Sequence, residues 1–375
     1  MVFYACLYLI SLVLLCASLY MRKRKGNAII SYALAAASIV IPCIISALRD
    51  SSIGTDTDNY PLAAFNSAKN NGITHFLSQP LVGFEYLYYL IVYVCSRVFN
   101  SFPLLLFITQ LLCVLPVFLV LDRESRKRGD IKIPIIGFLI FYLFSYNLSM
   151  NMMRQAVALS FCTLAFYNIL DKKRAWAIAE IIVAFLFHSF ALIMLPILLI
   201  YYICLKIRSK KVFAVFCSLF VCGLALSAIF LIPIVEFLGA LFPKILSPVY
   251  LSEFTKIRNF SFAELLFWGT ISAISIILIL PRVKNTALRR FYLIILLISP
   301  FTAVLNYYVH FSGRILLYFQ YIILYMFIPF GLQRVDDKKA FIRGSILYAL
   351  PIIVYWYYYY ICLNINETVP FLFAS

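Results

Sequence analysis

Residues 2–20 read VFYACLYLISLVLLCASLY, an apolar run without a charged residue, and the basic residues Arg22-Lys23-Arg24-Lys25 follow it almost directly. A helix needs about 20 apolar residues to cross the hydrocarbon core of a membrane. The run is too long for the core of a signal peptide, and no small-residue cleavage site with a polar mature region follows it. We therefore predict that residues 2–20 form a first membrane span that the protein retains.

The composition extends this interpretation to the whole chain. Of the 375 residues, 64% are hydrophobic, 17% are aromatic and 13% are charged, whereas soluble domains carry about 25% charged residues. Apolar runs of nearly spanning length recur from one end to the other. The sequence therefore predicts an all-α fold, a polytopic integral membrane protein with a single membrane domain over residues 1–375.

The formal net charge of +17 does not indicate nucleic-acid binding. The basic residues form short clusters between apolar runs, which is the positive-inside pattern of membrane proteins. They do not form a basic face with interleaved aromatic residues on a soluble module. The ten cysteines lie almost entirely within apolar segments and form no CxxC pair. We interpret them as small hydrophobic residues, and not as a disulfide framework or a metal site.

Six basic clusters hold 24 of the 32 Lys and Arg residues. Because Lys and Arg are enriched in cytoplasmic loops, this three-to-one bias places the clusters in the cytoplasm. Each interval between two clusters must then hold an even number of crossings. The clusters lie at residues 22–25, 123–132, 172–174, 206–211, 282–290 and 334–343.

The interval between Lys25 and Arg123 contains three apolar segments. Because the number of crossings in it must be even, one of the three segments cannot span the membrane. Residues 83–99 are the weakest of the three, because they are short, carry Glu85 and contain Arg97 near their end. Polar groups at membrane depth are tolerated only where protein or a watery cavity covers them. We therefore predict that residues 83–99 form a re-entrant or interfacial helix on the outer side.

About twelve spans and two outer loops follow from this orientation. The first loop, residues 48–82, is rich in Asp, Asn, Ser and Gly, and the second, residues 234–260, carries prolines and three basic residues. The predicted spans are residues 2–20, 28–47, 101–121, 133–150, 154–170, 175–188, 190–205, 212–233, 261–280, 290–307, 315–333 and 344–362.

Arg154 lies at an outer turn between two predicted spans. Counted from Asn151, Arg154 and Gln155 follow at three and four residues, which places all three on one helix face. Its guanidinium either snorkels to the outer water or clamps an anion, because guanidinium makes bidentate hydrogen bonds to phosphate. His188 lies at the next outer turn among bulky apolar residues. It is either a structural residue or a neutral base, since apolar surroundings lower the pKa of an imidazole.

The first outer loop begins with the stretch RDSSIGTDTDNY, from Arg49 to Tyr60. Its turn and cap formers suit an ordinary connection. Asp56 and Asp58, however, bring carboxylates to the outer leaflet, where a carboxylate can act as general base on a sugar hydroxyl. Two acids with the neighbouring Asn could also hold a divalent cation through oxygen ligands. Nothing in the spacing requires a metal, so we predict no cofactor.

Arg314 opens the next-to-last predicted span, and Tyr318, Tyr321 and Tyr325 follow it on one stripe of a helix. For the tyrosines, core packing with an interfacial aromatic belt is the favoured interpretation. For Arg314, we favour a second phosphate contact. These polar elements are far apart in the sequence, yet an orientation derived only from Lys and Arg residues places all of them on the outer side.

Together these motifs resemble the EpsG family, the Wzy-like polymerases of bacterial exopolysaccharide, capsule and O-antigen. The resemblance covers roughly residues 45–325 and implies a multi-pass enzyme of the bacterial inner (plasma) membrane, with its active site facing the periplasm or the outside. The implied reaction transfers a glycan from undecaprenyl pyrophosphate onto another lipid-linked repeat unit. The motifs are GTDTxxY at Gly54–Tyr60, Arg154-Gln155-Ala156, Phe187-His188 with Phe190-Ala191, and Gly313-Arg314 with Tyr318.

The resemblance also implies roles for single residues. Pyrophosphate leaves readily when preorganised cations meet its developing negative charge, which suits the arginines, and either Asp56 or His188 would serve as the base. The expected catalytic residues are Asp56, His188 and Arg154. The expected substrate-binding residues are Arg49, Arg154, Gln155, Arg314, Asp58, Tyr60 and Tyr318. The expected partners are the undecaprenyl-pyrophosphate-linked oligosaccharide, membrane lipid, and a chain-length regulator and flippase of the same pathway, with no nucleic acid.

Three other functions stay open at this point. An O-antigen ligase-type transferase would use the same lipid donor and the same arginine clamps. A flippase or transporter of lipid-linked oligosaccharide would carry charged groups through the depth of the membrane or repeated halves, and neither is evident here. A membrane O-acyltransferase would use an acyl-coenzyme A from the cytoplasm, whereas His188 is predicted to face outward.

Overall fold

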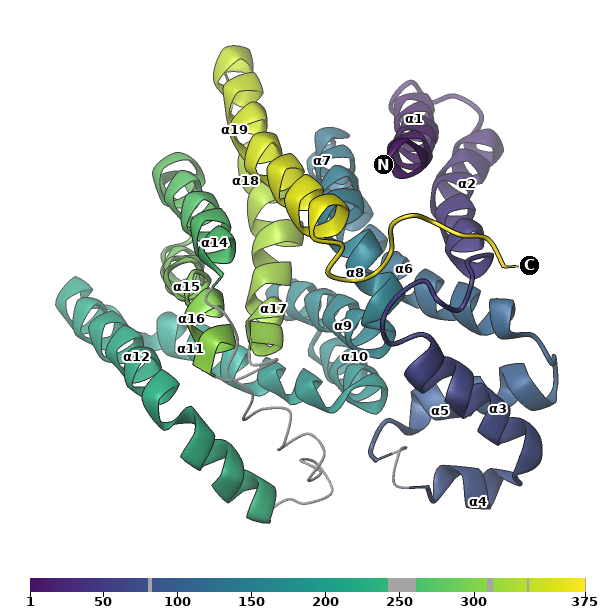
Figure 1. Ribbon diagram of the computed structural model, residues 1–375. Coiled ribbons are helices and arrows are strands. Elements are labelled where there is room, and N and C mark those ends of the chain that lie inside the picture. Colours follow the sequence, from purple (N-terminus) through teal and green to yellow (C-terminus); the bar gives the residue numbers. More distant parts are fainter. Residues whose placement is uncertain (80–82, 242–260, 309–312, 336, 375) are drawn as a thin grey trace. The chain divides into compact units, whose positions relative to one another are not determined.

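The computed structural model of the chain describes residues 1–79, 83–241, 261–308, 313–335 and 337–374, and its regular elements are helices (Figure 1). Within these residues, the only extended pairing is one isolated bridge between Arg49 and Phe373. A helix satisfies its own backbone hydrogen bonds, which lipid cannot do. The predicted all-α fold is confirmed.

Contacts divide the chain into two compact units. The first comprises Met1–Ala191 and Ile352–Ser375, and the second Leu192–Pro351. A single membrane domain over the whole chain stays a prediction. The helices of the first unit are α1 (Val2–Lys23), α2 (Ala28–Ala47), η1 (Asp58–Leu62), α3 (Ala63–Asn70), α4 (Ile73–Leu77), α5 (Tyr86–Arg97), α6 (Phe102–Arg128), α7 (Lys132–Ile140), η2 (Phe141–Ser145), α8 (Tyr146–Asn151), α9 (Met153–Leu170), α10 (Arg174–Phe187) and the start of η3 (Ser189–Ile193).

The second unit is helical as well. Within it, α11 packs against α15, and α16 packs against both α14 and α17. The last helix, α19, begins in this unit and ends in the first. The elements from here to the end of the chain are α11 (Met194–Lys206), α12 (Lys210–Leu241), α14 (Phe262–Ile274), η4 (Ser275–Ile279), η5 (Leu280–Arg282), α15 (Thr286–Ile298), α16 (Phe301–Tyr308), α17 (Gly313–Ile322), η6 (Ile323–Phe327), α18 (Ile328–Leu332), α19 (Lys338–Trp356) and η7 (Tyr357–Cys362).

Within the described residues, eight helical segments are long and apolar enough to cross a membrane. A ninth results if the pair Thr286–Ile298 and Phe301–Tyr307, bent by 41°, forms one span. The chain is therefore a multi-pass membrane protein. The eight segments are Val2–Lys23, Ala28–Ala47, Phe102–Arg128, Lys132–Asn151, Ser189–Lys206, Phe262–Arg282, Gly313–Leu332 and Lys338–Cys362.

Short polar signals set the ends of these helices. Asn27 caps α2 by accepting the backbone N–H groups of Ile29 and Ile30 at 2.9 and 3.2 Å. Ser101 caps α6, and Gly129, with a φ of +68°, ends it in the left-handed conformation that favours glycine. The N-terminal hairpin thus has the bounds that the hydropathy pattern predicts, to within a few residues, whereas α6 continues past its predicted end to the glycine that stops it.

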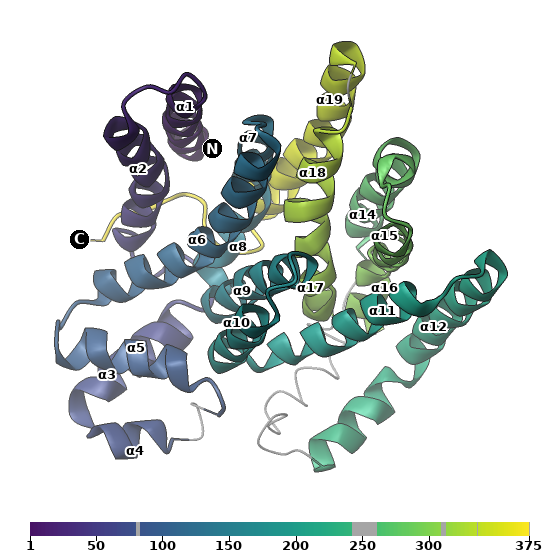
Figure 2. The same ribbon diagram turned by 180° about the vertical axis from the view of Figure 1, so that it is seen from behind.

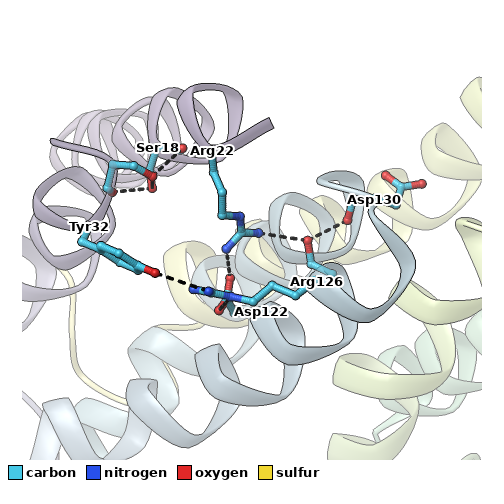
Figure 3. A network of polar contacts seen from close by, with 8 residues as sticks. Ser18, Arg22, Tyr32, Asp122, Arg126 and Asp130 are labelled. Carbon is cyan, nitrogen blue, oxygen red and sulfur yellow. Dashed lines mark hydrogen bonds and ion pairs between the residues drawn. The ribbon is translucent and has the colours of Figure 1, made fainter. Parts of the chain in front are cut away.

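A polar network holds the basic ends of α1 and α6 and the start of α2 together, as Figure 3 shows. Asp122 accepts hydrogen bonds from the guanidinium groups of Arg22 and Arg126, the latter at 2.8 Å. Arg22 also donates to the hydroxyl of Ser125 at 3.2 Å, and Arg126 to that of Tyr32 at 3.5 Å. A buried acid of this kind must be paired to be tolerated. Arg22 and Arg126, from the first two basic clusters, therefore fasten helices together.

The two predicted outer loops are more helical than expected. Residues 48–82 contain η1, α3 and α4, and α3 packs against α5. In both views, α3, α4 and α5 lie together beyond one end of α6 (Figures 1 and 2). The second predicted loop, residues 234–260, begins too early, because α12 continues to Leu241; the rest of it, residues 242–260, lies outside the described residues.

The segment predicted to be re-entrant or interfacial is α5, a helix of 12 residues. At about 1.5 Å per residue, it is about 18 Å long, well short of a hydrocarbon core of about 30 Å. One face is buried, with Tyr88, Tyr89 and Val92 on it. The re-entrant or interfacial placement itself stays a prediction.

Candidate functional site

The centre of the candidate site is the guanidinium of Arg154. Helix α8 ends at Asn151, Met152 leaves the helical conformation, and α9 starts at Met153. This break places Arg154 in the first turn of α9, with only 15% of its side chain exposed. There it forms an ion pair with Glu85 and donates to the hydroxyl of Tyr89 at 3.2 Å.

Three tyrosine rings surround this guanidinium. Its central carbon lies 5.5 Å from the ring centre of Tyr60, 5.7 Å from that of Tyr88 and 5.9 Å from that of Tyr89. These distances are within the range of cation–π attraction. Tyr60 belongs to the GTDTxxY motif, so the structure brings two of the sequence-predicted site residues into contact. Tyr60 is 36% exposed, which leaves one side of the cluster open.

Glu85 lies at the N-cap of α5, with 11% of its side chain exposed. The backbone N–H of Ser189 donates to its carboxylate, and Nε2 of His188 lies 4.0 Å from its Oε1 atom. Burial raises the pKa of Glu85, and the positive charge and hydrogen bond of Arg154 oppose this without cancelling it. Three segments far apart in the sequence therefore meet at one carboxylate.

His188 ends α10 in an extended conformation, with a φ of −158° and a ψ of 124°. Its Nδ1 atom accepts the backbone N–H of Phe190 at 3.2 Å. In the neutral imidazole, an accepting Nδ1 assigns the proton to Nε2, which faces Glu85. This geometry turns an N–H group of His188 toward Glu85, at a distance of 4.0 Å that is too long for a hydrogen bond. The predicted role of His188 as base stays a prediction.

The GTDTxxY motif is docked onto the break that precedes Arg154. The side-chain oxygen of Asn151 accepts from the hydroxyl of Thr55 at 2.8 Å and from the backbone N–H of Asp56 at 2.9 Å. Gly54 has a φ of +92°, and a Cβ atom there would come within 2.9 Å of the hydroxyl of Thr57 and 3.0 Å of the carbonyl oxygen of Met150. Only glycine suits that close approach.

The C-terminal tail holds the same loop from the other side. In Figure 1 it runs, in yellow, from the end of α19 past α8 toward the end of α2. The backbone N–H of Gly54 donates to the carbonyl of Glu367 at 3.0 Å, and that of Asp50 to the carbonyl of Leu372 at 2.9 Å. The side chain of Asn151 donates to that of Asn366 at 3.2 Å. The tail therefore positions the motif.

Arg49 is buried beneath this loop, with 2% of its surface exposed. Its guanidinium donates to the backbone carbonyl of Ser46 at 2.7 Å and to that of Met150 at 3.0 Å, and it contacts the sulfur of Met153 at 3.3 Å. It thus joins the end of α2 to the break between α8 and α9. This arrangement suits a positioning residue, and the predicted substrate contact of Arg49 stays a prediction.

The remaining predicted site residues differ in their exposure. In the first unit, Gln155 is buried in the first turn of α9, Asp56 is half-buried and Asp58 is exposed. Arg314 and Tyr318 lie on α17 in the second unit, where Tyr318 is buried. A joint phosphate site of Arg154 and Arg314 stays a prediction.

No group of three or more His, Cys, Asp and Glu side chains lies close enough together to hold a metal ion in the part of the chain that the structure describes. The predicted lack of a cofactor rests on the sequence alone.

Glu85 is the site residue that the sequence does not reveal. It is an acid inside an apolar segment, and that signal argues only against a span. Tyr88 and Tyr89 belong to the same apolar run, and nothing in the sequence pairs this run with Arg154.

The sequence matches the EpsG family over residues 32–373. No curated protein and no solved structure matches the chain. The matched range includes α5 with Glu85, the break before Arg154, His188 and most of the C-terminal tail.

Proposed function

The chain belongs to the EpsG family, and we propose that it is a polysaccharide polymerase of the bacterial inner membrane. It moves a glycan from undecaprenyl pyrophosphate onto the sugar end of a second lipid-linked repeat unit. The reaction takes place at the outer leaflet and serves the synthesis of capsule, exopolysaccharide or O-antigen of lipopolysaccharide. A chain-length regulator and a flippase of the same pathway are the proposed partners.

The observation that carries this proposal is the half-enclosed cluster of Arg154 with Glu85, Tyr60, Tyr88 and Tyr89, which we call the Arg154 cluster. The Arg154 side chain is 15% exposed, and its guanidinium lies inside a ring of three tyrosines, so it is a preorganised cation in surroundings that exclude most water. Such a cation stabilises negative charge where it develops. The planar guanidinium also matches phosphate oxygens in a bidentate manner. Pyrophosphate is therefore the leaving group that this cluster fits.

The proposed transfer forms one bond and breaks one bond. A hydroxyl oxygen of the acceptor sugar attacks the anomeric carbon of the donor, and the bond from that carbon to the pyrophosphate oxygen breaks. The electron pair of the broken bond stays on the pyrophosphate, opposite Arg154, and the hydroxyl proton goes to a base. Tyr60, exposed on one side, offers an aromatic face to the apolar side of a sugar ring.

The membrane placement follows from the basic clusters. We propose about twelve crossings, in which α9, α10 and α12 add to the eight or nine apolar segments. Helices α9 and α10 lie side by side (Figure 2) and have 18 and 14 residues. At about 1.5 Å per residue, α10 reaches only about 21 Å, which suits a thinned outer leaflet in which polyprenyl tails reach the site.

Deleting the gene and examining the surface glycan tests this function. Loss of a polymerase leaves single repeat units, loss of a ligase leaves long lipid-linked chains unattached, and loss of a flippase traps units inside the cell. We expect single repeat units. Long unattached chains would favour the ligase-type transferase, and units trapped inside would favour a transporter without chemistry.

Complementation of this deletion tests the site itself. We expect Arg154→Ala to reduce chain elongation by about 10²–10³-fold, the usual cost of removing one charge-stabilising group. Arg97→Ala is the matched control, because Arg97 is an arginine of the same unit that lies at the far end of α5 and donates to the backbone carbonyl of Lys69 at 2.6 Å. Normal chain lengths from an Arg154→Ala protein that inserts normally would remove Arg154 from the mechanism.

A further inference from the structure

We propose that Glu85 is the general base of the transfer, and that Arg154 holds it inactive until a lipid pyrophosphate takes over the guanidinium. This inference rests on the proposed function and assigns the base that the reaction needs. In the structure, the guanidinium of Arg154 forms an ion pair with the carboxylate of Glu85. In the reaction, the same guanidinium would instead neutralise the pyrophosphate leaving group. Binding of the donor would thereby switch on the base.

Glu85 is held by more than its ion pair. Its Oε2 atom is paired with Arg154, whereas Oε1 faces the Nε2 atom of His188 at 4.0 Å. The backbone N–H of Ser189 donates to the same carboxylate. The carboxylate therefore keeps two neighbours that do not depend on Arg154. It stays in place when the guanidinium turns to another anion.

A docked pyrophosphate competes with Glu85 for Arg154. The pyrophosphate group offers more negative charge than one carboxylate and presents several oxygens to the fork of the guanidinium. The tyrosine rings at 5.5–5.9 Å hold the cation on its flanks without neutralising it. Pyrophosphate would consequently displace Glu85 as the main partner of Arg154.

The displacement makes Glu85 a stronger base. Burial raises the pKa of its carboxyl, and Arg154 is the main group that opposes this rise. Once the guanidinium neutralises pyrophosphate instead, the pKa of Glu85 rises further, and a carboxylate with a higher pKa is the stronger base. The charged and titratable groups that face Glu85 are Arg154 from α9, His188 at the end of α10 and Tyr88 on its own helix.

The proton released by the acceptor hydroxyl is then taken up by Glu85. The acceptor hydroxyl loses its proton to a carboxylate oxygen of Glu85 as its oxygen bonds to the anomeric carbon. The pyrophosphate leaves with the electron pair of the broken bond, and Glu85 returns its proton to water after the product departs. His188 takes no proton in this step, because its Nδ1 atom accepts from Phe190 and its Nε2 atom carries a proton; it is a positioning residue.

The experiment uses the full chain in lipid nanodiscs, with undecaprenyl pyrophosphate as the binding probe and a lipid-linked repeat unit as the substrate. Glu85→Gln keeps the size of the side chain and removes the base. We expect elongation to fall by about 10²–10⁴-fold, the usual contribution of a general base. Binding of undecaprenyl pyrophosphate should be unchanged or tighter, because a neutral amide competes less for Arg154 than a carboxylate does. Asp171→Asn is the matched control, since Asp171 pairs with Lys127 and Lys173 at the basic ends of the helices.

A pH profile and a second variant separate this role from a structural one. Elongation by the wild type should fall as the pH drops through the raised pKa of Glu85, whereas the residual rate of Glu85→Gln should not follow that step. Glu85→Asp retains a carboxylate one methylene shorter and should keep part of the activity together with the pH dependence. A merely structural Glu85 would give the same profile for every variant.

The outcomes distinguish this inference from the proposed function. A wild type that elongates and a Glu85→Gln chain within a few-fold of it would overturn the base and leave the polymerase intact. Loss of undecaprenyl pyrophosphate binding in proportion to activity would also overturn it, because Glu85 would then only hold Arg154. A wild type that elongates no lipid-linked unit would overturn the proposed function and the base together.

Discussion

Replacing Gly54 by alanine tests whether the GTDTxxY motif is held in the one conformation that the structure shows. The backbone there has a φ of +92°, which costs an alanine about 1–2 kcal/mol. The new Cβ atom would also lie 2.9 Å from the hydroxyl of Thr57 and 3.0 Å from the carbonyl oxygen of Met150. Because the second atom belongs to the backbone, the loop itself has to move.

The displacement has a calculable cost. Moving the loop strains or breaks the bond from the Gly54 N–H to Glu367 and the two bonds to the side chain of Asn151. At about 1 kcal/mol for each hydrogen bond, the loss of one or two of them and the backbone strain together amount to about 2–4 kcal/mol. We expect Gly54→Ala to unfold at a clearly lower temperature and to elongate poorly.

The assay is thermal unfolding of the purified protein by size-exclusion fluorescence, together with chain elongation in cells. Gly129→Ala is the matched control, because Gly129 has a φ of +68° and a Cβ atom added there would meet no heavy atom within 4 Å. It should show only the backbone strain of about 1–2 kcal/mol and normal elongation. A Gly54→Ala protein as stable and as active as Gly129→Ala would refute the docked loop.

Three further predictions concern the Arg154 cluster and its supports. Arg154→Lys keeps the charge but loses the planar fork, so elongation should fall by about tenfold or more, with weaker binding of undecaprenyl pyrophosphate in a filter assay; wild-type binding would show that charge alone suffices. Tyr88→Phe should be as stable as the wild type, since the Tyr88 hydroxyl is buried and makes no hydrogen bond to the described residues. Tyr89→Phe should be less stable by about 1 kcal/mol or more, because the hydrogen bond from Arg154 to the Tyr89 hydroxyl is lost. Equal unfolding temperatures of the two variants would contradict this. Asn366→Ala should lower the stability by about 1–2 kcal/mol, because Asn151 loses its hydrogen bond to the tail, and unchanged unfolding would show that this side-chain bond does not support the loop.

The sequence predicts a large part of the fold because lipid imposes so few solutions. Apolar length and the basic clusters predict α1 and α2 closely and locate α6, since a span needs about 20 apolar residues whatever it packs against. The break that places Arg154 at the start of α9 also falls at the predicted outer turn. The helical content of residues 48–82 was not predictable, because turn formers dominate their composition and the helices there are short.

The site could be predicted only where a motif carries it. Arg154, His188 and Tyr60 stand in motifs, and the structure brings all three to Glu85 or to its ion-pair partner. Glu85 itself could not be assigned, because a lone acid next to apolar residues gives no sign of its partner. Arg49 illustrates the opposite difficulty. Its place beside the motif loop favours a phosphate contact, whereas in the structure its guanidinium donates to two backbone carbonyls.

We propose that the Arg154 cluster faces the outside of the cell while the basic clusters face the cytoplasm. Single cysteines at Tyr60 and at Lys127, in a chain without its native cysteines, test it with a membrane-impermeant thiol reagent. Both side chains are accessible, at 36% and 61%. The cysteine at position 60 should react in intact cells and that at position 127 only after permeabilisation. Labelling of position 127 in intact cells, with position 60 protected until permeabilisation, would contradict this orientation and the outward-facing site with it.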